Sequence, residues 1–243
     1  MPLTRRRLAA LGTALLPLPV LAQRPAGFPN RPVRLVVPFA PGGNSDTLAR
    51  LIQPRMAVSL GHPVVVENRP GAGGALAAGQ VASAPADGHT LLFESASFVV
   101  AQFIQRSVPF DHERDFAPVG MVAEVPYVIG VARTSGIADL AGYLAAARRR
   151  EGLSFGTPGV GSVGHLAGVL LAHRAGVKLD HVPYRGGADA ARDLAGGTLA
   201  SVCITANSLI PLVEGGRATA SVVTAAKRGG IAGVPTVAEA GFP

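Results

Sequence analysis

Short apolar runs alternate along this chain with segments in which apolar positions recur every three or four residues, and glycine or proline separates most of them. Residues 33–37 are rich in β-branched side chains and flanked by prolines, which favours a buried parallel strand. Ser45 and Asp46 then stand as candidate N-caps before apolar positions with a helical period, from Leu48 to Met56. The first unit is therefore predicted to be a strand, a glycine-containing loop and a helix.

The same unit recurs through the rest of the sequence. Further apolar runs predict strands at 63–67, 89–93, 117–123, 125–131, 153–156, 177–183, 199–204 and 218–223, and helical patterns lie at 75–84, 137–150, 162–170, 186–194 and 207–214. This alternation predicts an α/β fold with largely parallel sheets and right-handed crossovers. The two apolar runs on either side of residue 124 follow one another without a helix, so we place the passage into a second domain there.

Two of the predicted helices carry specific expectations. Pro54 lies inside the first helix and predicts a kink or an early end, because proline lacks the amide hydrogen. In the helix that begins after Ser162, the apolar positions Leu166, Val169 and Leu170 form a stripe that predicts the buried face.

Two loops of similar design connect a strand to a capped helix. They read PFAPGGNSD at residues 38–46 and GTPGVGSVGH at residues 156–165. Each presents free backbone N–H groups and the positive end of a helix dipole, which favour an anion. If the two halves of the chain face each other across a cleft, both loops point at one ligand, and an anion with two carboxylates fits that geometry.

A third polar segment follows the predicted strand at 89–93. Glu94, Ser95 and Ser97 come after its carboxyl end, which is the edge of an open α/β sheet where ligands bind. Capping of a following helix explains the same residues equally well.

The N-terminal residues predict an export signal. Residues 1–22 combine three consecutive arginines, an apolar stretch and a small-residue cleavage site after Ala22. The start TRRRL resembles a twin-arginine signal, but ordinary signals also begin with basic residues, so both export routes stay open. The apolar stretch is too short and too interrupted by Pro17 and Pro19 to span a membrane, and no other window is long enough. We expect a periplasmic mature protein.

Composition and charge exclude some classes of function. The chain has 243 residues, 48% of them hydrophobic, which supplies a substantial core. Its formal charge is +7, and removing the three arginines of residues 1–22 leaves +4. Without a basic stripe, and with no tryptophan for stacking, nucleic-acid binding is not expected. The single Cys203 lies in an apolar run and predicts a buried structural thiol. We expect no cofactor and no bound metal.

A series of motifs gives a more specific indication of the class of protein. In order, the chain contains RPVRLVVPFAPGG, PVVVENRPGAGG, DGHTLL, DFAPVG, GTPGVGSVGHLAG, HVPYRGGADAARDLAGG and VPTVAEAGFP. From about Phe28 to its last residue the sequence resembles the Bug-type extracytoplasmic solute receptors, the substrate-binding component of tripartite tricarboxylate transporters. The resemblance implies a non-enzymatic, monomeric receptor with two domains of the type II periplasmic-binding-protein fold. Each domain would be a mostly parallel sheet flanked by helices, and two crossover strands would join them.

The resemblance also implies the domain boundaries and the site. Residues 23–123, continued by 224–243, would form the first domain, and 124–223 the second. The domains would close by hinge motion on a small carboxylate and deliver it to membrane transporter subunits. The implied ligand-binding residues are Phe39, Ala40, Gly43, Asn44, Ser45, Asp46, Ser95, Ser97, Thr157, Gly161, Ser162, His165, Tyr184, Arg185 and Gly186.

Residue types suggest roles within this set. Backbone amides and the hydroxyls of Ser45, Thr157 and Ser162 would hold a carboxylate, directly or through water. Asp46 is a poor partner for an anion, so it either caps its helix or meets an amino group of the ligand. His165 lies at a helix start, where the dipole disfavours its protonation, so we expect it to be a neutral orienting residue, or else a core histidine. Arg185 is either a ligand contact or a solvated surface charge.

The sequence departs from the family pattern in two places. Ala200 and Ser201 stand where an acidic residue is common, and Asn207 replaces a smaller residue, so selectivity is expected to differ there. Family members also continue beyond VPTVAEAGFP with helices that complete the first domain. We therefore expect the 243-residue chain to lack part of that domain and to be less stable than a full receptor.

Two enzymatic alternatives rest on the second loop. Residues 159–164 form a GxGxxG motif between a strand and a helix, with Asp180 at a suitable distance for a ribose, which would indicate a nucleotide-binding enzyme. Asp180 however precedes the end of its predicted strand. A hydrolase would use Ser162 and His165, but no acidic residue is placed to orient the histidine.

Overall fold

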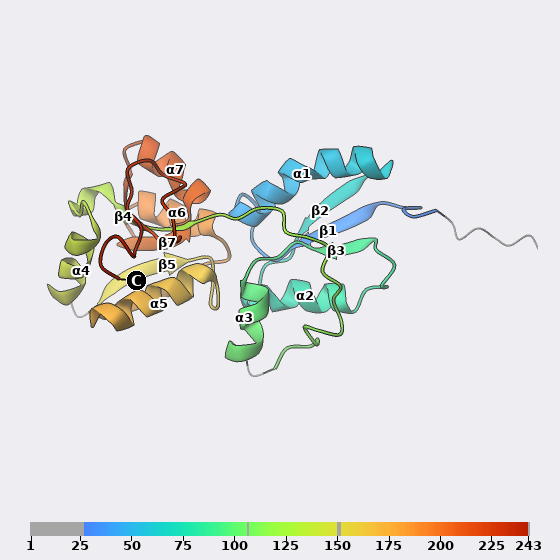
Figure 1. Cartoon of the computed structure of the whole chain (residues 1–243), viewed down its shortest axis with the longest axis horizontal. Coiled ribbons are helices and arrows are strands. Elements are labelled where there is room, and N and C mark those ends of the chain that lie inside the picture. The colour runs from blue at the N-terminus through green and yellow to red at the C-terminus, as the bar shows by residue number, and fades with distance from the viewer. Residues whose placement is uncertain (1–26, 106, 150–151, 243) are drawn as a thin grey trace, which may run out of the picture.

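The computed structural model describes residues 27–105, 107–149 and 152–242 and contains two separate β-sheets (Figure 1). We call residues 27–116 the N-terminal lobe and residues 127–242 the C-terminal lobe. Residues 117–126 join the lobes without forming a helix or strand. The export signal predicted at residues 1–22 lies outside the described residues. The predicted α/β class, with helices on both faces of two sheets, is confirmed.

The N-terminal lobe is a three-layer unit around a parallel sheet of order β2-β1-β3. Helix α1 covers one face, where Ala49 packs on Val33, Leu35 and Val37, and α2 covers the other (Figure 1). In chain order the elements are β1 (Val33–Val37), α1 (Asn44–Leu60), β2 (Val64–Asn68), the 3-10 turn η1 (Ala72–Gly74), α2 (Ala75–Ala82), β3 (Thr90–Leu92) and α3 (Ser97–Ile104). The sequence pattern did not predict α3, because its residues are apolar on nearly all sides.

The C-terminal lobe is built in the same way around five strands in the order β6-β5-β7-β4-β8. Helices α6 and α7 cover one face of this sheet, and α4 and α5 cover the other. The elements are β4 (Tyr127–Ala132), η2 (Arg133–Ser135), α4 (Leu140–Arg149), β5 (Leu153–Thr157), α5 (Val163–Ala175), β6 (Leu179–Pro183), α6 (Gly187–Ala195), β7 (Ser201–Thr205), α7 (Ala206–Glu214) and β8 (Ala218–Val223). The sheet is not parallel throughout, because β4 runs antiparallel to both of its neighbours.

Two predicted elements differ from the structure. Helix α1 continues through Pro54 to Leu60, so the proline does not end it. Pro54 is exposed, and water can therefore reach the carbonyl group that its missing amide leaves free. The apolar run at 117–123 forms no strand and is exposed, because neither sheet offers it a hydrogen-bonding partner.

Helix α5 buries a different face from the one predicted. Leu166, Val169 and Leu170 are 39%, 49% and 53% exposed, whereas Gly164 and Gly168 are buried. A side chain at Gly164 would collide with the carbonyl oxygen of Cys203, and one at Gly168 would collide with the ring of Phe155. The helix therefore turns its glycines towards the sheet and approaches it closely, which leaves the larger apolar residues outside.

Residues 224–242 pack on the C-terminal lobe, although we expected residues 224–243 to continue the first domain. Thr236 forms a parallel bridge with Val223, and the amides of Val223 and Val237 complete this short pairing. Val234 and Phe242 pack against the two cores of the C-terminal lobe. In the described residues, segment 117–126 is thus the connection between the lobes (Figure 1).

Two further sequence expectations concern the single cysteine and membrane-spanning segments. Cys203 is a free thiol, 1% exposed, and burial raises its pKa to about 12, so the prediction of a buried structural thiol is confirmed. In the described part of the chain no helix is both long and apolar enough to cross a bilayer.

The glycine face of α5 generates a test of the fold. Gly164→Ala is expected to lower the free energy of unfolding by about 1–3 kcal/mol, because the added methyl group forces α5 away from the backbone of β7. Urea denaturation measures the loss. Gly196→Ala at the end of α6, where an added Cβ meets only ordinary contacts, is the control, and equal losses in both variants would contradict the close approach.

Candidate functional site

The facing edges of the two lobes carry the carboxyl ends of parallel strands. In the N-terminal lobe, α1 and α3 begin at this edge, after β1 and β3. In the C-terminal lobe, α5, α6 and α7 follow the parallel strands β5, β6 and β7. Each helix start leaves backbone N–H groups free and carries a partial positive charge. The topology therefore gathers the helix N-termini of both lobes around the space between them.

The lobes touch at this edge through backbone and small residues. The amide of Ala40 donates a 2.9 Å hydrogen bond to the carbonyl oxygen of Arg185. A Cβ added at Gly73 would lie 2.6 Å from the carbonyl oxygen of Val160, and one at Gly161 would collide with Ile104 of α3. The first loop, 38–46, thus contacts Arg185 and Gly186, and the second loop, 156–165, contacts η1 and α3, so both loops lie where the lobes meet.

The first loop enters α1 through Gly43, which is the N-cap, so the helix begins earlier than the cap candidates Ser45 and Asp46 suggested. Phe39 and Ser45 are buried. The side-chain oxygen of Asn44 is buried and has no hydrogen-bond partner. This loop therefore contains an acceptor oxygen without a donor.

Asp46 is engaged within its own loop and helix, although Gly43 and not Asp46 is the N-cap of α1. Its carboxylate accepts a 2.9 Å hydrogen bond from the amide of Gly42 and two more from Arg50, at 3.0 and 3.1 Å. Burial acts to raise its pKa, but the hydrogen bonds from Arg50, Gly42 and Asn68 outweigh burial and lower it. With both oxygens engaged, Asp46 has no free oxygen aimed at a ligand.

Glu94, Ser95 and Ser97 form a hydrogen-bonded cluster where β3 leads into α3. Glu94 Oε1 accepts from the amide of Ser95 at 2.9 Å and from the hydroxyl of Ser97 at 2.7 Å, and the two serine hydroxyls lie 2.9 Å apart. The other oxygen, Oε2, is shielded from solvent and has no partner. Burial, opposed by these hydrogen bonds, raises the pKa of Glu94 to about 7.

The second loop is held by its own hydroxyl groups. Ser162 is the N-cap of α5, as predicted, because its Oγ accepts from the amide of His165 at 3.3 Å, and it also donates to the carbonyl of Gly159 at 2.7 Å. The Thr157 hydroxyl contacts the same carbonyl at 3.2 Å and His181 Nε2 at 2.7 Å. These two hydroxyls support the loop, so ligand contacts from it would come chiefly from backbone amides.

A pair of histidines lies beside this loop. The rings of His165 and His181 are stacked with centroids 4.0 Å apart. His165 Nδ1 accepts a 3.2 Å hydrogen bond from the amide of Gly161, so the neutral ring carries its proton on Nε2. Burial lowers the pKa of His165, which agrees with the neutral residue that we expected. Sequence reasoning missed His181, because only the parallel pairing of β5 with β6 brings it beside Thr157.

The predicted site residues 184–186 reach the junction of the lobes mainly through their backbone. Tyr184 OH donates a 2.7 Å hydrogen bond to Asp193 of α6, so its side chain packs within the C-terminal lobe. Arg185 is exposed and contacts the other lobe through its carbonyl group. Gly186 is buried at the start of α6, close to Ala40.

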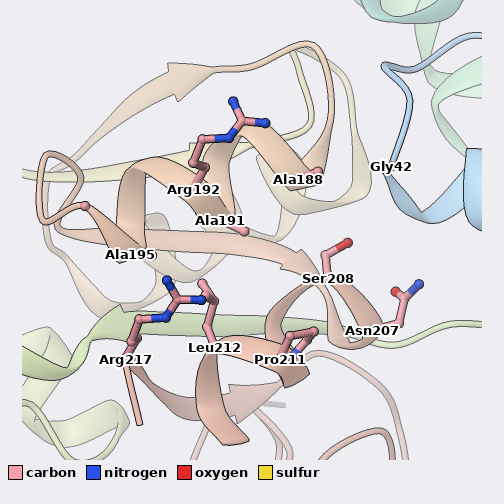
Figure 2. A pocket seen from close by; sticks show the side chains of 11 residues that line it. Gly42, Ala188, Ala191, Arg192, Ala195, Asn207, Ser208, Pro211, Leu212 and Arg217 are labelled. Carbon is pink, nitrogen blue, oxygen red and sulfur yellow. The ribbon is translucent and has the colours of Figure 1, made fainter. Parts of the chain in front are cut away.

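A groove of about 530 Å³ lies between α6 and α7, next to the first loop. Figure 2 shows Asn207 and Ser208 at the start of α7 near Gly42, with Arg192 and Arg217 further along the groove. Asn207 is one of the residues at which we expect selectivity to differ from that of the family. The groove runs from Gly42 of the first loop along α6 and α7 to two cationic side chains, which favour an anion.

The features required by the enzymatic alternatives are not assembled. Asp180 pairs in register with Ser154 near the start of β5, remote from the loop that follows Thr157, and lies 3.5 Å from Lys178. Ser162 Oγ contacts the backbone amide of His165, whose ring nitrogen is bound to Gly161, so the imidazole does not activate the serine. Within the described ranges no three His, Cys, Asp or Glu residues are grouped to hold a metal ion.

The half-buried histidine pair predicts a pH dependence of stability. Burial, and then the charge of His165, lower the pKa of His181 from 6.5 to about 4. Between these values the unfolded chain binds a proton that the folded protein does not, so stability is expected to fall as the pH drops through this range. In urea denaturation from pH 7 to 4, His181→Gln should lose stability less steeply than the original protein. Equal slopes would contradict the assignment.

Comparison with known proteins identifies the family to which the chain belongs. Residues 48–243 match the family model described as tripartite tricarboxylate transporter family receptor. The UPF0065 protein encoded in the tcbD-tcbE intergenic region of Pseudomonas sp. (strain P51) is 43% identical over 98% of this chain and 72% of its own length. The protein BugT of Bordetella pertussis is 35% identical over 98% of this chain and 74% of its own length.

Solved structures agree with the sequence relatives. Rpa4515 of R. palustris, solved with adipate, has a TM-score of 0.85 and 37% identity, over 89% of this chain and 74% of its own. MatC of Rhodopseudomonas palustris, solved with bound malate, has a TM-score of 0.81 and 34% identity over the same shares. The match in sequence and in fold covers both lobes and both loops. The chain therefore belongs to the receptor family of the tripartite tricarboxylate transporters, a family of periplasmic solute-binding proteins.

Proposed function

We propose that this protein captures a small carboxylate between its two lobes and presents it to the membrane subunits of a tripartite tricarboxylate transporter. The observation that carries the proposal is the gathering of helix N-termini and glycine loops from both lobes around one space. Free amides at helix starts bind anions without needing a charged side chain. The adipate and malate in the two solved relatives are carboxylates of this kind.

The proposed ligand lies between the loop of residues 39–46, the segment 94–97 and the loop of residues 157–165. Backbone amides of the first and second loops hold a carboxylate, and Ser45 and His165 Nε2 are the side-chain donors that remain for it. Residues 184–186 close the site through their backbone. The groove beside Asn207 and Ser208 accommodates the more distant end of a longer ligand.

Binding is proposed to proceed by closure of two domains. Segment 117–126 joins the lobes and would act as the hinge, with the domain boundary near residue 123. Capture and release require no covalent step, so the protein acts as a receptor and not as an enzyme. It acts as a monomer. The competing class from the sequence is a nucleotide-binding role for residues 159–164, which the position of Asp180 near the start of β5 disfavours.

Titration calorimetry tests the proposed ligand class. We expect saturable binding of adipate or malate, and no binding of adipamide, in which neutral amide groups replace the carboxylates. The reason is that helix N-termini attract negative charge. NAD titrated under the same conditions is the control for the competing class, and saturable NAD binding without carboxylate binding would overturn the proposal.

Gly73→Ala tests closure. Because its added Cβ would lie 2.6 Å from the Val160 carbonyl, the lobes cannot meet as they do here, and we expect at least a roughly tenfold loss of dicarboxylate affinity. Gly61→Ala is the matched control, since Gly61 has nearly the same φ, +66° against +60°, and open space around it. Because both substitutions strain the backbone similarly, both variants should melt at similar temperatures. Loss of affinity in both would contradict the role of the contact.

A further inference from the structure

The two lobes share an exposed apolar surface that the proposed ligand site does not use. It consists of large apolar side chains on two helices, one from each lobe, and we call it the α3–α5 face. Its residues are Val99, Phe103 and Ile104 on α3 and Leu166, Val169 and Leu170 on α5. Phe103 is 79% exposed. Apolar side chains gathered in this way mark a site of interaction, because leaving them in water is costly.

The two halves of this face meet where the lobes touch. A Cβ added at Gly161, just before α5, would collide with the side chain of Ile104 and lie 3.7 Å from Val100 of α3. Val160, next to this contact in the second loop, is exposed as well. The exposed apolar residues of α5 are spaced three and four apart, so they follow one side of the helix away from the contact. The face is therefore continuous across both lobes while the lobes are in contact.

The α3–α5 face depends on how the lobes are arranged. Figure 1 shows α3 and α5 along the lower edge of the two lobes, and the connecting segment 117–126 passes above them in this view. Because we propose this segment as the hinge, opening of the lobes would move the start of α5 away from α3 and divide the face. A partner that binds the whole face thus distinguishes a closed receptor from an open one.

The charges around the face define the chemistry of its partner. Neither α3 nor residues 163–172 of α5 contain an Asp, Glu, Lys or Arg residue. Cations lie at one end, because Arg174 is in the last turn of α5 and Arg148 of α4 donates a 3.3 Å hydrogen bond to the backbone at that end. Lys178, close by in sequence, is balanced by Asp180 at 3.5 Å. The complementary surface is therefore apolar, with acidic groups opposite Arg148 and Arg174.

This charge pattern favours a protein partner over two other occupants. A phospholipid surface would be met by cations spread around the apolar side chains, whereas here they are confined to one end. A second copy of this chain, docked through the same face, would bring no acidic side chain from that face to Arg174. A membrane protein to which the receptor delivers its ligand has neither restriction.

We propose that the α3–α5 face is the surface through which this receptor docks on the membrane subunits of its transporter, against an apolar surface with acidic side chains facing Arg148 and Arg174. This inference rests on the proposed function, because it names the surface used for delivery. Ligand capture and docking use separate side chains, since the residues of the α3–α5 face are not among the proposed ligand contacts. Closure of the lobes links the two events.

Docking is measured with the membrane subunits of the transporter held in nanodiscs, with the receptor in a solution of malate or adipate. The double variant Phe103→Ser/Leu170→Ser removes one apolar side chain from each half of the face, and we expect it to dock about tenfold more weakly or worse. Arg174→Glu should also weaken docking, because it reverses the charge opposite the acidic groups. Leu51→Ser/Val58→Ser is the matched control, since these side chains on α1 are 70% and 83% exposed and α1 lies on the opposite edge (Figure 1).

Calorimetry on the same variants keeps docking separate from ligand capture. The Phe103→Ser/Leu170→Ser variant should bind the dicarboxylate as the original protein does, and circular dichroism checks that it is folded. Undiminished docking by this variant, an equal loss in the α1 control, or no docking by the original protein overturns the inference while ligand capture stands. If the folded original protein binds no dicarboxylate, the proposed function fails and this inference falls with it.

The two other occupants have their own outcomes. Empty nanodiscs of phosphatidylethanolamine and phosphatidylglycerol should not retain the receptor, and retention as tight as with the membrane subunits would assign the face to lipid. Sedimentation of the original protein should show a monomer. A dimer that the Phe103→Ser/Leu170→Ser variant dissociates would assign the face to a second copy. Either result overturns docking on the membrane subunits.

Discussion

Parallel strand pairing is the constraint on which the rest of this structure depends. When β1, β2 and β3 run side by side in the same direction, the helices that follow them begin at one edge of the sheet, and β5, β6 and β7 impose the same order on the other lobe. The loops with chemical significance are thereby concentrated on two facing edges. An anion can then be held by backbone amides, whose geometry the fold itself fixes.

Glycine makes the close approaches that this arrangement needs. Gly164 and Gly168 let α5 lie directly against Cys203 and Phe155, which brings its N-terminus to the end of β5. Gly73 lets the backbone of Val160 approach the N-terminal lobe, and Gly161 leaves room for the side chain of Ile104. Several glycines therefore do more than permit turns, because they set the distance between the elements that carry the site residues.

The polar groups of the site fall into two kinds. Asp46, Thr157 and Ser162 are used within their own loops, so they hold backbone amides in place. Glu94 and Asn44 each retain an unused buried oxygen. This difference separates residues whose polar atoms are used within their own loops from residues that retain an unpartnered polar atom.

The sequence by itself determined the α/β class, most of the strands and helices, the two glycine loops and the cap at Ser162, because strand and helix periodicity and capping are local signals. Only the tertiary structure decided which atoms remain free at the site. It placed His181 beside Thr157, turned the apolar stripe of α5 outwards, packed residues 224–242 on the C-terminal lobe and left Glu94 Oε2 without a donor. Each of these depends on contacts between segments far apart in the chain, and residue type alone does not reveal how closely two backbones approach or which hydrogen bonds are already used.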